Sequence, residues 1–361
     1  MNDNLFKIFQ QFTAQGQPAG IVPFGNGHIN DTYRVQMVDP TAPGYILQRK
    51  NHAIFKDIPG MMQNILHVTD HIRKKLEAAG ETEVDRKVMT YLPAKDNNYF
   101  VQDENGNFWT LFLFVRGSHG IEEVTNPTQA FSAGKAFGQF QLQLADLPGN
   151  LLIETIPNFH NGKFRYGQLL TAIAENRAGR VAAMQPELDK LIARADEMVQ
   201  LQEWIDNGEL PLRITHNDTK INNVLYDEED NILCIIDLDT VMPGSALFDF
   251  GDAIRTLGNT ASEDEPQLEK INFNRDYYRA FAEGYLSESS RFLTEKERKN
   301  LAFSCRYMVW EQSVRFLTDY LNGDIYYKIA YPEHNKVRTL AQIRYLEVME
   351  QNIGFMTGIS G

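Results

Sequence analysis

The stretch that decides the fold runs from Arg213 to Thr240 and reads RITHNDTKINNVLYDEEDNILCIIDLDT. Two β-like segments flank a polar turn at 227–231, which predicts a hairpin. Such a hairpin would bring Asn223 and Asp237 to one end. Asp237 directly follows the apolar run ILCII, and a carboxylate at the end of a buried strand is costly unless it is paired or binds a metal. An acidic surface loop is therefore the weaker interpretation.

The spacing of polar residues in this stretch points to phosphoryl transfer from ATP. His216, Asp218 and Asn223 form the pattern H-x-D-x-x-x-x-N, and Asp237 falls where a kinase has the aspartate of D-F-G. The reaction needs a carboxylate beside the acceptor hydroxyl and two oxygen ligands for Mg²⁺. We expect Asp218 to be catalytic, Asn223 and Asp237 to bind the metal, and His216 to brace the loop. Asp239 is expected to add an outer or second-metal contact.

A glycine-rich turn near the N-terminus, Gly25-Asn26-Gly27-His28, lies between two β-like segments. The backbone N–H groups of such a loop can bind ATP phosphates, although a plain hairpin turn fits the same pattern. Asn30 replaces the third glycine of G-x-G-x-x-G. We therefore expect the side chains of His28 and Asn30 to reach into the cleft.

The strand that supplies a phosphate-pairing lysine in kinases reads YILQRK over 45–50, with Gln48 at the expected position. The helix expected at 57–79 offers Asn64 and His67 where the partner glutamate would lie. The sequence thus predicts that the usual Lys–Glu pair is absent. Arg49 is the alternative phosphate contact if the strand register shifts by one residue.

Outside these motifs, the chain divides into a β-rich N-terminal third and a helical remainder. Strands are expected at four places: 20–50, 87–92, 97–102 and 108–115. Helical periodicity dominates from residue 127 onward. The sequence therefore predicts an α+β protein with an N-lobe over 1–115 and a C-lobe over 116–361.

Composition excludes several classes of protein. The 361 residues hold 35 Lys and Arg against 48 Asp and Glu, a net charge of −13, which argues against a nucleic-acid binder. Cys234 and Cys305 are the only cysteines, so a disulfide framework is excluded and a reducing compartment is favoured. No apolar stretch approaches the ~20 residues of a membrane span, and the first residues do not read as a secretory signal. We expect a cytoplasmic protein without membrane partners.

Together, the motifs resemble the aminoglycoside phosphotransferase/choline kinase-like enzymes, with further support from DFGD at 249–252. Within that group, the sequence is most similar to the N-acetylhexosamine 1-kinases. That similarity is carried by PFGNGHINDTY (23–33), RFLTDYLNGDIYY (315–327) and YPEHNKVRT (331–339).

The resemblance implies a two-lobed, protein-kinase-like fold with a small β-rich N-lobe and a larger, mostly helical C-lobe. It implies phosphorylation of the anomeric 1-hydroxyl of N-acetylglucosamine or N-acetylgalactosamine with ATP and Mg²⁺. The residues implied for ATP are Gly25, Asn26, Gly27, Gln48, Phe114 and Val115. Those implied for the sugar are His28, Asp218, Arg315 and Tyr326.

Two further expectations concern the C-lobe. Asp249 should brace the catalytic loop, and the break at Gly323 should fold Tyr326 back beside the end of its helix. Three alternatives remain open: a kinase of another small alcohol (another sugar, homoserine, choline or an aminoglycoside), a nucleotide-binding scaffold without catalysis, and a metal-dependent phosphohydrolase. The lack of an obvious aromatic cage argues against a quaternary amine.

Overall fold

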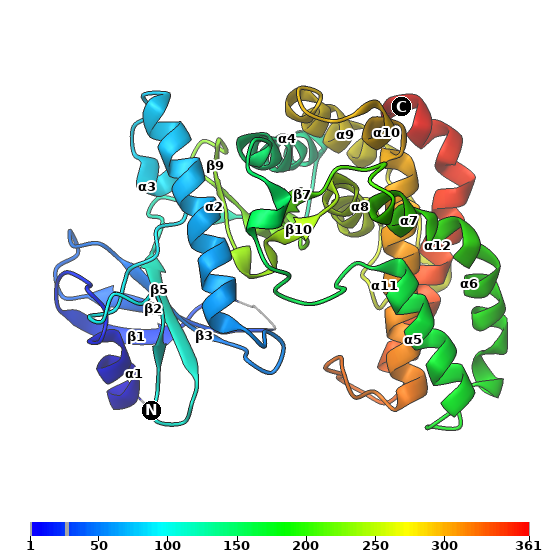
Figure 1. Cartoon of the computed structure of the whole chain (residues 1–361), viewed down its shortest axis with the longest axis horizontal. Helices are drawn as coiled ribbons and strands as arrows, with labels where there is room; N and C mark the ends of the chain where they lie inside the picture. The colour runs from blue at the N-terminus through cyan, green and yellow to red at the C-terminus, as the bar shows by residue number, and fades with distance from the viewer. Residues whose placement is uncertain (1, 26–28, 361) are drawn as a thin grey trace. The chain divides into compact units, whose positions relative to one another are not determined.

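The computed structural model describes residues 2–25 and 29–360 and contains two compact units (Figure 1). The first unit comprises Met1–Gly120, Asn150–Pro157 and Asn223–Met242. The second comprises Ile121–Gly149, Asn158–Asn222 and Pro243–Gly361. The chain first leaves the first unit near the expected boundary at 115–116. It then re-enters that unit twice, so the hairpin after Asn222 belongs to the first unit.

A five-stranded antiparallel sheet dominates the first unit. Its strands are β1 (Pro18–Pro23), β2 (Asp31–Met37), β3 (Tyr45–Lys50), β4 (Val101–Gln102) and β5 (Phe108–Leu113), in the order β1-β2-β3-β5-β4. Helix α1 (Asn2–Phe9) covers one face, where Leu5 and Phe9 share a buried cluster with Leu47. Because side chains alternate along a strand, Gln48 and Lys50 face the opposite side.

Helix α2 (Ile58–Ala78) begins where the carboxylate of Asp57 accepts a hydrogen bond from the N–H of Gly60 at 2.9 Å. Its Asn64 is buried and donates to the carbonyl oxygens of Ile153 at 2.8 Å and Val241 at 3.0 Å. The helix is thereby tied to two other segments of the first unit, at a position where a kinase would carry its glutamate.

The expected strand at 87–92 is wrong. Residues 84–87 form a short helix, α3 (Val84–Lys87), and only Tyr91 pairs, in an isolated bridge with Phe112. Val88 and Met89 are nevertheless buried. The apolar pattern at 88–91 therefore reflects burial of an irregular segment rather than a β-ladder.

A second sheet in the first unit contains β6 (His119–Gly120), β8 (Val224–Tyr226) and β9 (Ile232–Ile235). The turn between β8 and β9 is closed by Asp227, whose carboxylate accepts hydrogen bonds from the N–H groups of Glu229 at 3.0 Å and Asn231 at 2.8 Å. Asp and Asn favour such turns because their side chains bond to the following backbone. The predicted hairpin is confirmed.

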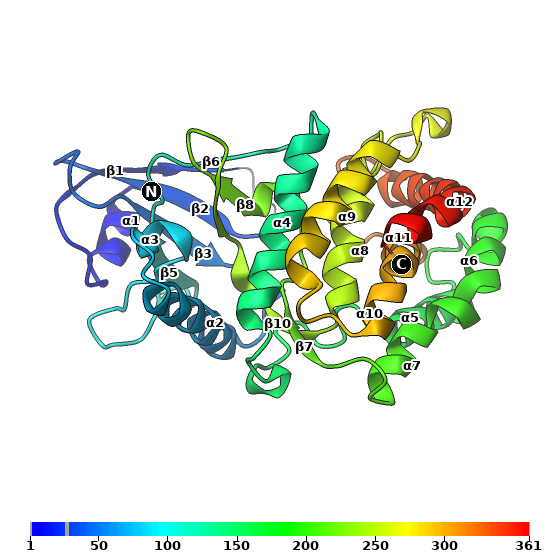
Figure 2. The same ribbon diagram turned by 90° about the horizontal axis from the view of Figure 1, so that it is seen from above.

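Two helices of the second unit, α4 (Pro127–Leu144) and α9 (Arg275–Ser289), lie side by side (Figure 2). A methyl group at Gly134 would lie 2.1 Å from the carbonyl oxygen of Phe281, and one at Gly284 would lie 2.1 Å from that of Phe131. Such approach of two helix backbones is open only to glycine, so these positions set the packing of the pair.

Helix α11 (Leu301–Asn322) is buried along most of its length and contacts α12 (His334–Ser360), α8 (Ala246–Leu257) and α5 (Gly162–Glu175) (Figure 1). The remaining helices are α6 (Gln185–Met198), α7 (Gln200–Asp206) and α10 (Glu295–Lys299), and β7 (Arg213–Thr215) pairs with β10 (Met242–Gly244). Across residues 2–25 and 29–360, every helix is too short or too polar to cross a lipid bilayer.

Candidate active site

The loop that carries Asp218 lies in the second unit, between β7 and the 3-10 turn η3 (Ile221–Asn223). Asn217 has a φ of 63°, a left-handed conformation that asparagine tolerates better than most residues. His216 is fully buried, and its Nδ1 accepts a hydrogen bond from the backbone N–H of Asp218 at 3.3 Å. This geometry supports the expected bracing role of His216.

Asp249, in the first turn of α8, holds the same loop. Its carboxylate accepts hydrogen bonds from the backbone N–H groups of His216 at 2.9 Å and Asn217 at 2.8 Å. Gln141 donates a third at 2.6 Å. Burial raises the pKa of Asp249, while His216 and the three donors oppose that rise. The expectation that Asp249 braces the loop is confirmed.

Asp252, one turn further along α8, holds the other side of the loop. Its carboxylate accepts hydrogen bonds from the N–H of Thr219 at 3.1 Å and from Nε of Arg255 at 3.0 Å. The Thr219 hydroxyl donates to the carbonyl oxygen of Asp249 at 2.6 Å. Helix α8 thus fixes the backbone immediately before and after Asp218.

Asp218 is held as a carboxylate. Its side chain is 25% exposed, and its Oδ1 lies 2.9 Å from Nζ of Lys220. Burial opposes the charge, but Lys220, His216 and Arg255 together lower the pKa of Asp218 below the usual range. At neutral pH this group can accept a hydrogen bond from a hydroxyl and orient it.

The two expected metal-binding residues lie at the open end of the hairpin in the first unit. Strands β8 and β9 pair Val224 with Ile235, and the N–H of Ile236 donates to the carbonyl oxygen of Asn223 at 2.9 Å. Asp237 follows at once, with a φ of 59°. An aspartate in this left-handed conformation is strained, and such strain tends to occur at functional positions.

The chemistry of these two side chains fits Mg²⁺. An amide and a carboxylate supply hard oxygen ligands, and Mg²⁺ is usually bound by one or two carboxylates together with water and substrate phosphates. The described part of the chain, 2–25 and 29–360, contains no group of three or more His, Cys, Asp or Glu side chains arranged to hold a metal.

A buried polar cluster joins β3 to Asp239 within the first unit. Nζ of Lys50 lies 2.5 Å from Oδ1 of Asp239, and the two side chains are only 1% and 3% exposed. Lys50 also donates to Oε1 of Gln48 at 2.5 Å. A lysine–carboxylate pair that differs from the usual Lys–Glu pair therefore lies here, which the sequence reasoning did not foresee. The lysine lies two residues beyond Gln48 on the same strand face, and its partner follows the hairpin instead of lying on α2.

The neighbours of this cluster also differ from expectation. Asn30 donates to Oδ2 of Asp239 at 2.8 Å and accepts from the N–H of Asn51 at 3.0 Å, so its amide anchors the N-terminal loop. Arg49 pairs with Asp31, and both side chains are nearly half exposed. Each carboxylate oxygen of Asp239 thus accepts a hydrogen bond from a protein side chain.

Other nucleotide residues expected from sequence are placed as follows. Gly25 has a φ of 76°, and a methyl group there would meet nothing within 4 Å. Asn26, Gly27 and His28 lie outside the described residues. Gln48 donates to the hydroxyl of Thr32 at 3.0 Å.

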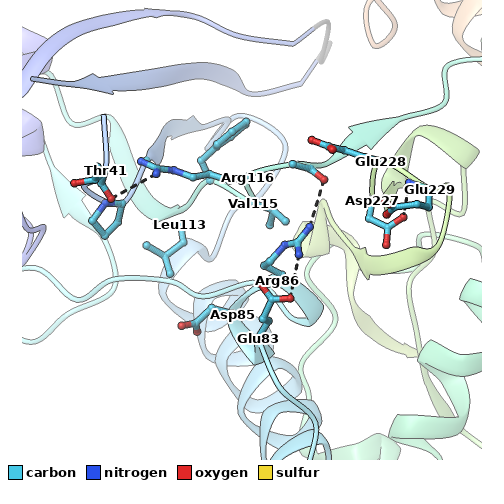
Figure 3. A pocket seen from close by; sticks show the side chains of 14 residues that line it. Thr41, Glu83, Asp85, Arg86, Leu113, Val115, Arg116, Asp227, Glu228 and Glu229 are labelled. Carbon is cyan, nitrogen blue, oxygen red and sulfur yellow. Dashed lines mark hydrogen bonds and ion pairs between the residues drawn. The ribbon is translucent and has the colours of Figure 1, made fainter. Parts of the chain in front are cut away.

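Phe114 lies at the end of β5, with the guanidinium of Arg34 4.0 Å above its ring and the ring of Phe24 5.8 Å away. The flat aromatic surface and its cationic neighbour could stack with a purine. Phe114 and Val115 also line a pocket of about 620 Å³ (Figure 3).

That pocket is too acidic for a triphosphate. Figure 3 shows Arg86 bound to Glu83 and Arg116 reaching the carbonyl oxygen of Thr41. Carboxylates in the lining nevertheless outnumber these two guanidiniums; they belong to Glu83, Asp85, Asp227, Glu228 and Glu229. Because like charges repel, the phosphates of a nucleotide are not expected in this pocket.

In the second unit, the chain after α11 returns to the helix that it has left. Gly323 ends α11 with a φ of 94°, and Asp319 accepts hydrogen bonds from the backbone N–H groups of residues 325–327 at 2.8–2.9 Å. Tyr326 consequently interacts with the side chain of Arg315. The predicted return of Tyr326 to the helix end is confirmed.

Arg315 belongs to a buried group that also includes Glu311, Arg165 and His160, which we call the Glu311 cluster. The carboxylate of Glu311 lies 3.6 Å from Nε of Arg315, 3.5 Å from Nε of Arg165 and 3.7 Å from Nδ1 of His160. Burial opposes ionisation, but Arg315, His160 and Arg165 outweigh it and lower the pKa of Glu311 to about 2. One carboxylate thus faces two guanidiniums.

His160 connects this cluster to the catalytic loop. Its Nε2 lies 3.2 Å from the carbonyl oxygen of Asn217, the residue before Asp218. The adjacent Phe159 presents its ring to the guanidinium of Arg315 at 5.0 Å. Asp218, which we expect to be catalytic, therefore belongs to one connected part of the second unit with Arg315 and Tyr326, which we expect to bind the sugar.

Comparison with known proteins agrees with this geometry. Residues 20–288 match the phosphotransferase enzyme family. The chain belongs to this family. The structure of a microcompartment-associated aminopropanol kinase is similar, with 15% sequence identity and a TM-score of 0.61. The match covers 99% of this chain and 98% of the kinase. Spectinomycin phosphotransferase is 15% identical with a TM-score of 0.61, covering 97% and 99%. Amicoumacin kinase is 14% identical with a TM-score of 0.60, covering 97% and 93%. The expected kinase-like α+β fold is confirmed.

Sequence reasoning missed four polar residues of this phosphotransferase: Lys50, His160, Arg165 and Glu311. Lys50 could have been found, because the alternation of a strand places it on the face of Gln48. The other three carry no local signal. Glu311 lies on α11, which is buried on nearly all of its faces. Its cationic partner Arg165 lies on α5, which is far from α11 in the sequence.

Proposed function

We propose that this phosphotransferase transfers the γ-phosphoryl group of ATP to the anomeric hydroxyl of N-acetylglucosamine or N-acetylgalactosamine, with Mg²⁺ as cofactor. The use of a nucleotide and a divalent cation is supported by related structures, one in complex with ADP and one with AMP-PNP and Ca²⁺. It is also supported by the H-x-D-x-x-x-x-N loop and the oxygen ligands Asn223 and Asp237.

In this proposal, Asp218 accepts a hydrogen bond from the acceptor hydroxyl and orients its oxygen toward the γ-phosphorus. An anomeric hydroxyl is more acidic than an ordinary alcohol, so its proton passes to Asp218 late in the transfer. Asn223 and Asp237 hold Mg²⁺, which when bound neutralises charge on the triphosphate. Lys220 keeps Asp218 ionised, and Asp249 and Asp252 keep the loop in place.

The observation that carries the acceptor class is the charge of the Glu311 cluster. Two guanidiniums and one carboxylate leave an excess positive charge beside the catalytic loop. Such a site repels ammonium groups. Related structures include an aminopropanol kinase and an ethanolamine kinase, whose names specify amine-bearing acceptors. The positive charge of the cluster argues against an amine-bearing acceptor for this protein and favours a neutral sugar.

A neutral sugar is recognised by hydrogen bonds that converge on its hydroxyl and acetamido groups. Arg315 can donate to sugar oxygens, and Tyr326, which is 56% exposed, offers a phenol beside it. An analogue that leaves a buried donor unpaired is rejected, because that donor loses its hydrogen bond to water without replacement. His28 is proposed as a third contact on the strength of the sequence resemblance.

The test is ATP consumption by the purified protein with N-acetylglucosamine, N-acetylgalactosamine, glucose, choline and aminopropanol side by side. We expect the two N-acetylhexosamines to be the best substrates. Turnover of choline or aminopropanol alone would reject the proposed acceptor, and phosphate release without any acceptor would indicate a phosphohydrolase.

Asp218→Asn tests the catalytic assignment in the same assay. Loss of the base should reduce kcat by about 10²–10⁴-fold while ATP binding persists, because general-base catalysis contributes in that range. Asp206→Asn, at the exposed end of α7, is the matched control. If the Asp218→Asn variant turned over substrate at a rate near that of the wild type, Asp218 would not be the catalytic base.

A further inference from the structure

We propose that Glu311 is a positioning residue for acceptor binding: its carboxylate fixes the guanidinium of Arg315 and, through His160, couples that guanidinium to the catalytic loop. The inference deepens the proposed function and rests on it, because it assumes that Arg315 contacts the acceptor. Glu311 itself touches neither substrate nor the reacting atoms.

Glu311 differs from a glutamate that is buried for structural reasons. Both of its carboxylate oxygens are buried and lack a hydrogen-bond partner among the described residues. Glu297 is equally buried, yet it accepts hydrogen bonds from Nε of Arg213 at 2.6 Å and from the backbone N–H of Thr294 at 2.7 Å. Burying a charge without hydrogen bonds is unfavourable unless something else requires its field. Glu311 therefore acts through charge on its neighbours.

The two guanidiniums in the cluster are not equivalent. Arg165 donates twice to the carbonyl oxygen of Phe159, at 3.1 and 2.9 Å, and once to Gln168 at 3.1 Å. Arg315 donates to Gln312 at the longer distance of 3.3 Å, interacts with the side chain of Tyr326, and lies over the rings of Phe159 and Tyr327. Arg165 is thus fixed by hydrogen bonds, whereas the position of Arg315 depends more on attraction to Glu311.

His160 makes this arrangement continuous with the loop. Its side chain is 5% exposed, with Nδ1 3.7 Å from Glu311 and Nε2 3.2 Å from the carbonyl oxygen of Asn217. The rings of Phe159 and Phe248 lie 4.3 and 5.4 Å from its own, and Tyr307 donates to its carbonyl oxygen at 2.6 Å. The imidazole and the backbone of His160 are therefore both fixed in place. A shift of the loop at Asn217 would move His160 and, with it, a neighbour of Glu311.

Loss of the Glu311 charge should release Arg315 without disturbing the nucleotide. We expect Glu311→Gln to raise KM for the acceptor by about 10- to 100-fold, since small misplacement of a positioning group has effects of this size. KM for ATP should change less than about twofold, because the charged groups that face Glu311 are Arg315, Arg165 and His160, none of which is expected to bind ATP. A general loss of structure would affect both constants.

The matched control is Glu350→Gln. Glu350 also faces two arginines, Arg194 at 2.7 Å and Arg306 at 3.6 Å, but it lies on α12 outside the cluster. Its replacement should leave both KM values unchanged. This control shows whether the effect on the acceptor KM is specific to Glu311 or follows from removing any glutamate that lies between two arginines.

A double variant separates positioning from charge balance and guards against misfolding. Glu311→Gln leaves two buried guanidiniums unpaired, whereas Glu311→Gln/Arg165→Gln restores the original net charge of the cluster. We expect the double variant to fold and to retain the raised acceptor KM, because Arg315 still lacks its anion. Return of KM to the wild-type value in the double variant would overturn the inference, as would an unchanged KM in Glu311→Gln.

Failure of this inference is distinguishable from failure of the proposed function. If wild-type protein phosphorylates an acceptor other than an N-acetylhexosamine, the proposed function fails, and the KM comparison is made with that acceptor. If N-acetylhexosamines are phosphorylated and the acceptor KM of Glu311→Gln is unchanged, the inference alone fails.

Discussion

Two buried charge clusters of this phosphotransferase, Lys50–Asp239 and the Glu311 cluster, differ in charge balance and in hydrogen bonding. In the first unit, one positive and one negative charge balance each other, since Nζ of Lys50 lies 2.5 Å from Oδ1 of Asp239. Asn30 donates a hydrogen bond to the other carboxylate oxygen of Asp239. In the second unit, Glu311 faces Arg165 and Arg315 at 3.5–3.6 Å and accepts no hydrogen bond from the described residues.

We propose that the difference separates a pair that stabilises the fold from a cluster that takes part in acceptor binding. A balanced and hydrogen-bonded pair fixes one arrangement of β3 against the segment after the hairpin. An unbalanced cluster leaves positive charge available to oxygen atoms of an acceptor. Both sites are buried. The Lys50–Asp239 pair and the Glu311 cluster therefore differ in their net charge and in the number of hydrogen bonds that the carboxylate accepts.

The largest expected effect comes from breaking the balanced pair. Lys50→Met should leave the charge of Asp239 buried and unpaired and lower the free energy of unfolding by about 3–5 kcal/mol, as measured by urea denaturation. The double variant Lys50→Met/Asp239→Leu should recover most of that loss, because two apolar side chains replace a pair at little cost. A single variant as stable as wild type would contradict the structural role of the pair.

The second effect concerns the pH dependence of the Glu311 cluster. The pKa of Glu311 is about 2 in the folded protein against 4.5 for the free group. A depressed pKa stabilises the fold above the unfolded value, so this contribution, on the order of 3 kcal/mol, is present at pH 7 and disappears as pH falls from about 4.5 toward 2. The stability gap between wild type and Glu311→Gln should shrink over that range. A gap independent of pH would contradict an ionised Glu311.

A smaller effect is expected from the brace of the catalytic loop. Asp249→Asn has one acceptor oxygen where the carboxylate has two, so a backbone N–H of His216 or Asn217 loses its partner. We expect kcat to fall by about 10- to 100-fold through displacement of Asp218. Asp276→Asn, an aspartate in the first turn of α9, should leave kcat unchanged. Equal effects of the two variants would reject a specific role for Asp249.

What sequence could predict is local. The H-x-D-x-x-x-x-N spacing, the turn at 227–231 and the glycine break at 323 are each contained within a few residues, and their geometry follows from turn chemistry and helix termination. The bracing by Asp249 was also expected from the sequence, where Asp249 and Asp252 open a helix after Ser245.

What sequence could not predict depends on pairs far apart in the chain. Lys50 and Asp239 are separated by 189 residues, and periodicity says nothing about which strand face meets which turn. Val88, Met89 and Tyr91 are buried without joining a ladder, so the strand expected at 87–92 is not formed. Glu311 gave no signal because a helix buried nearly all round hides its one charged site among core positions.

The most direct test of the central claim is the structure of the product. Phosphorus–proton correlation NMR on the reaction of the protein with ATP, Mg²⁺ and N-acetylglucosamine would identify the carbon that carries the new phosphate. We expect coupling between the phosphorus and the anomeric H1. Coupling to H6, or inorganic phosphate as the only new phosphorus species, would contradict it.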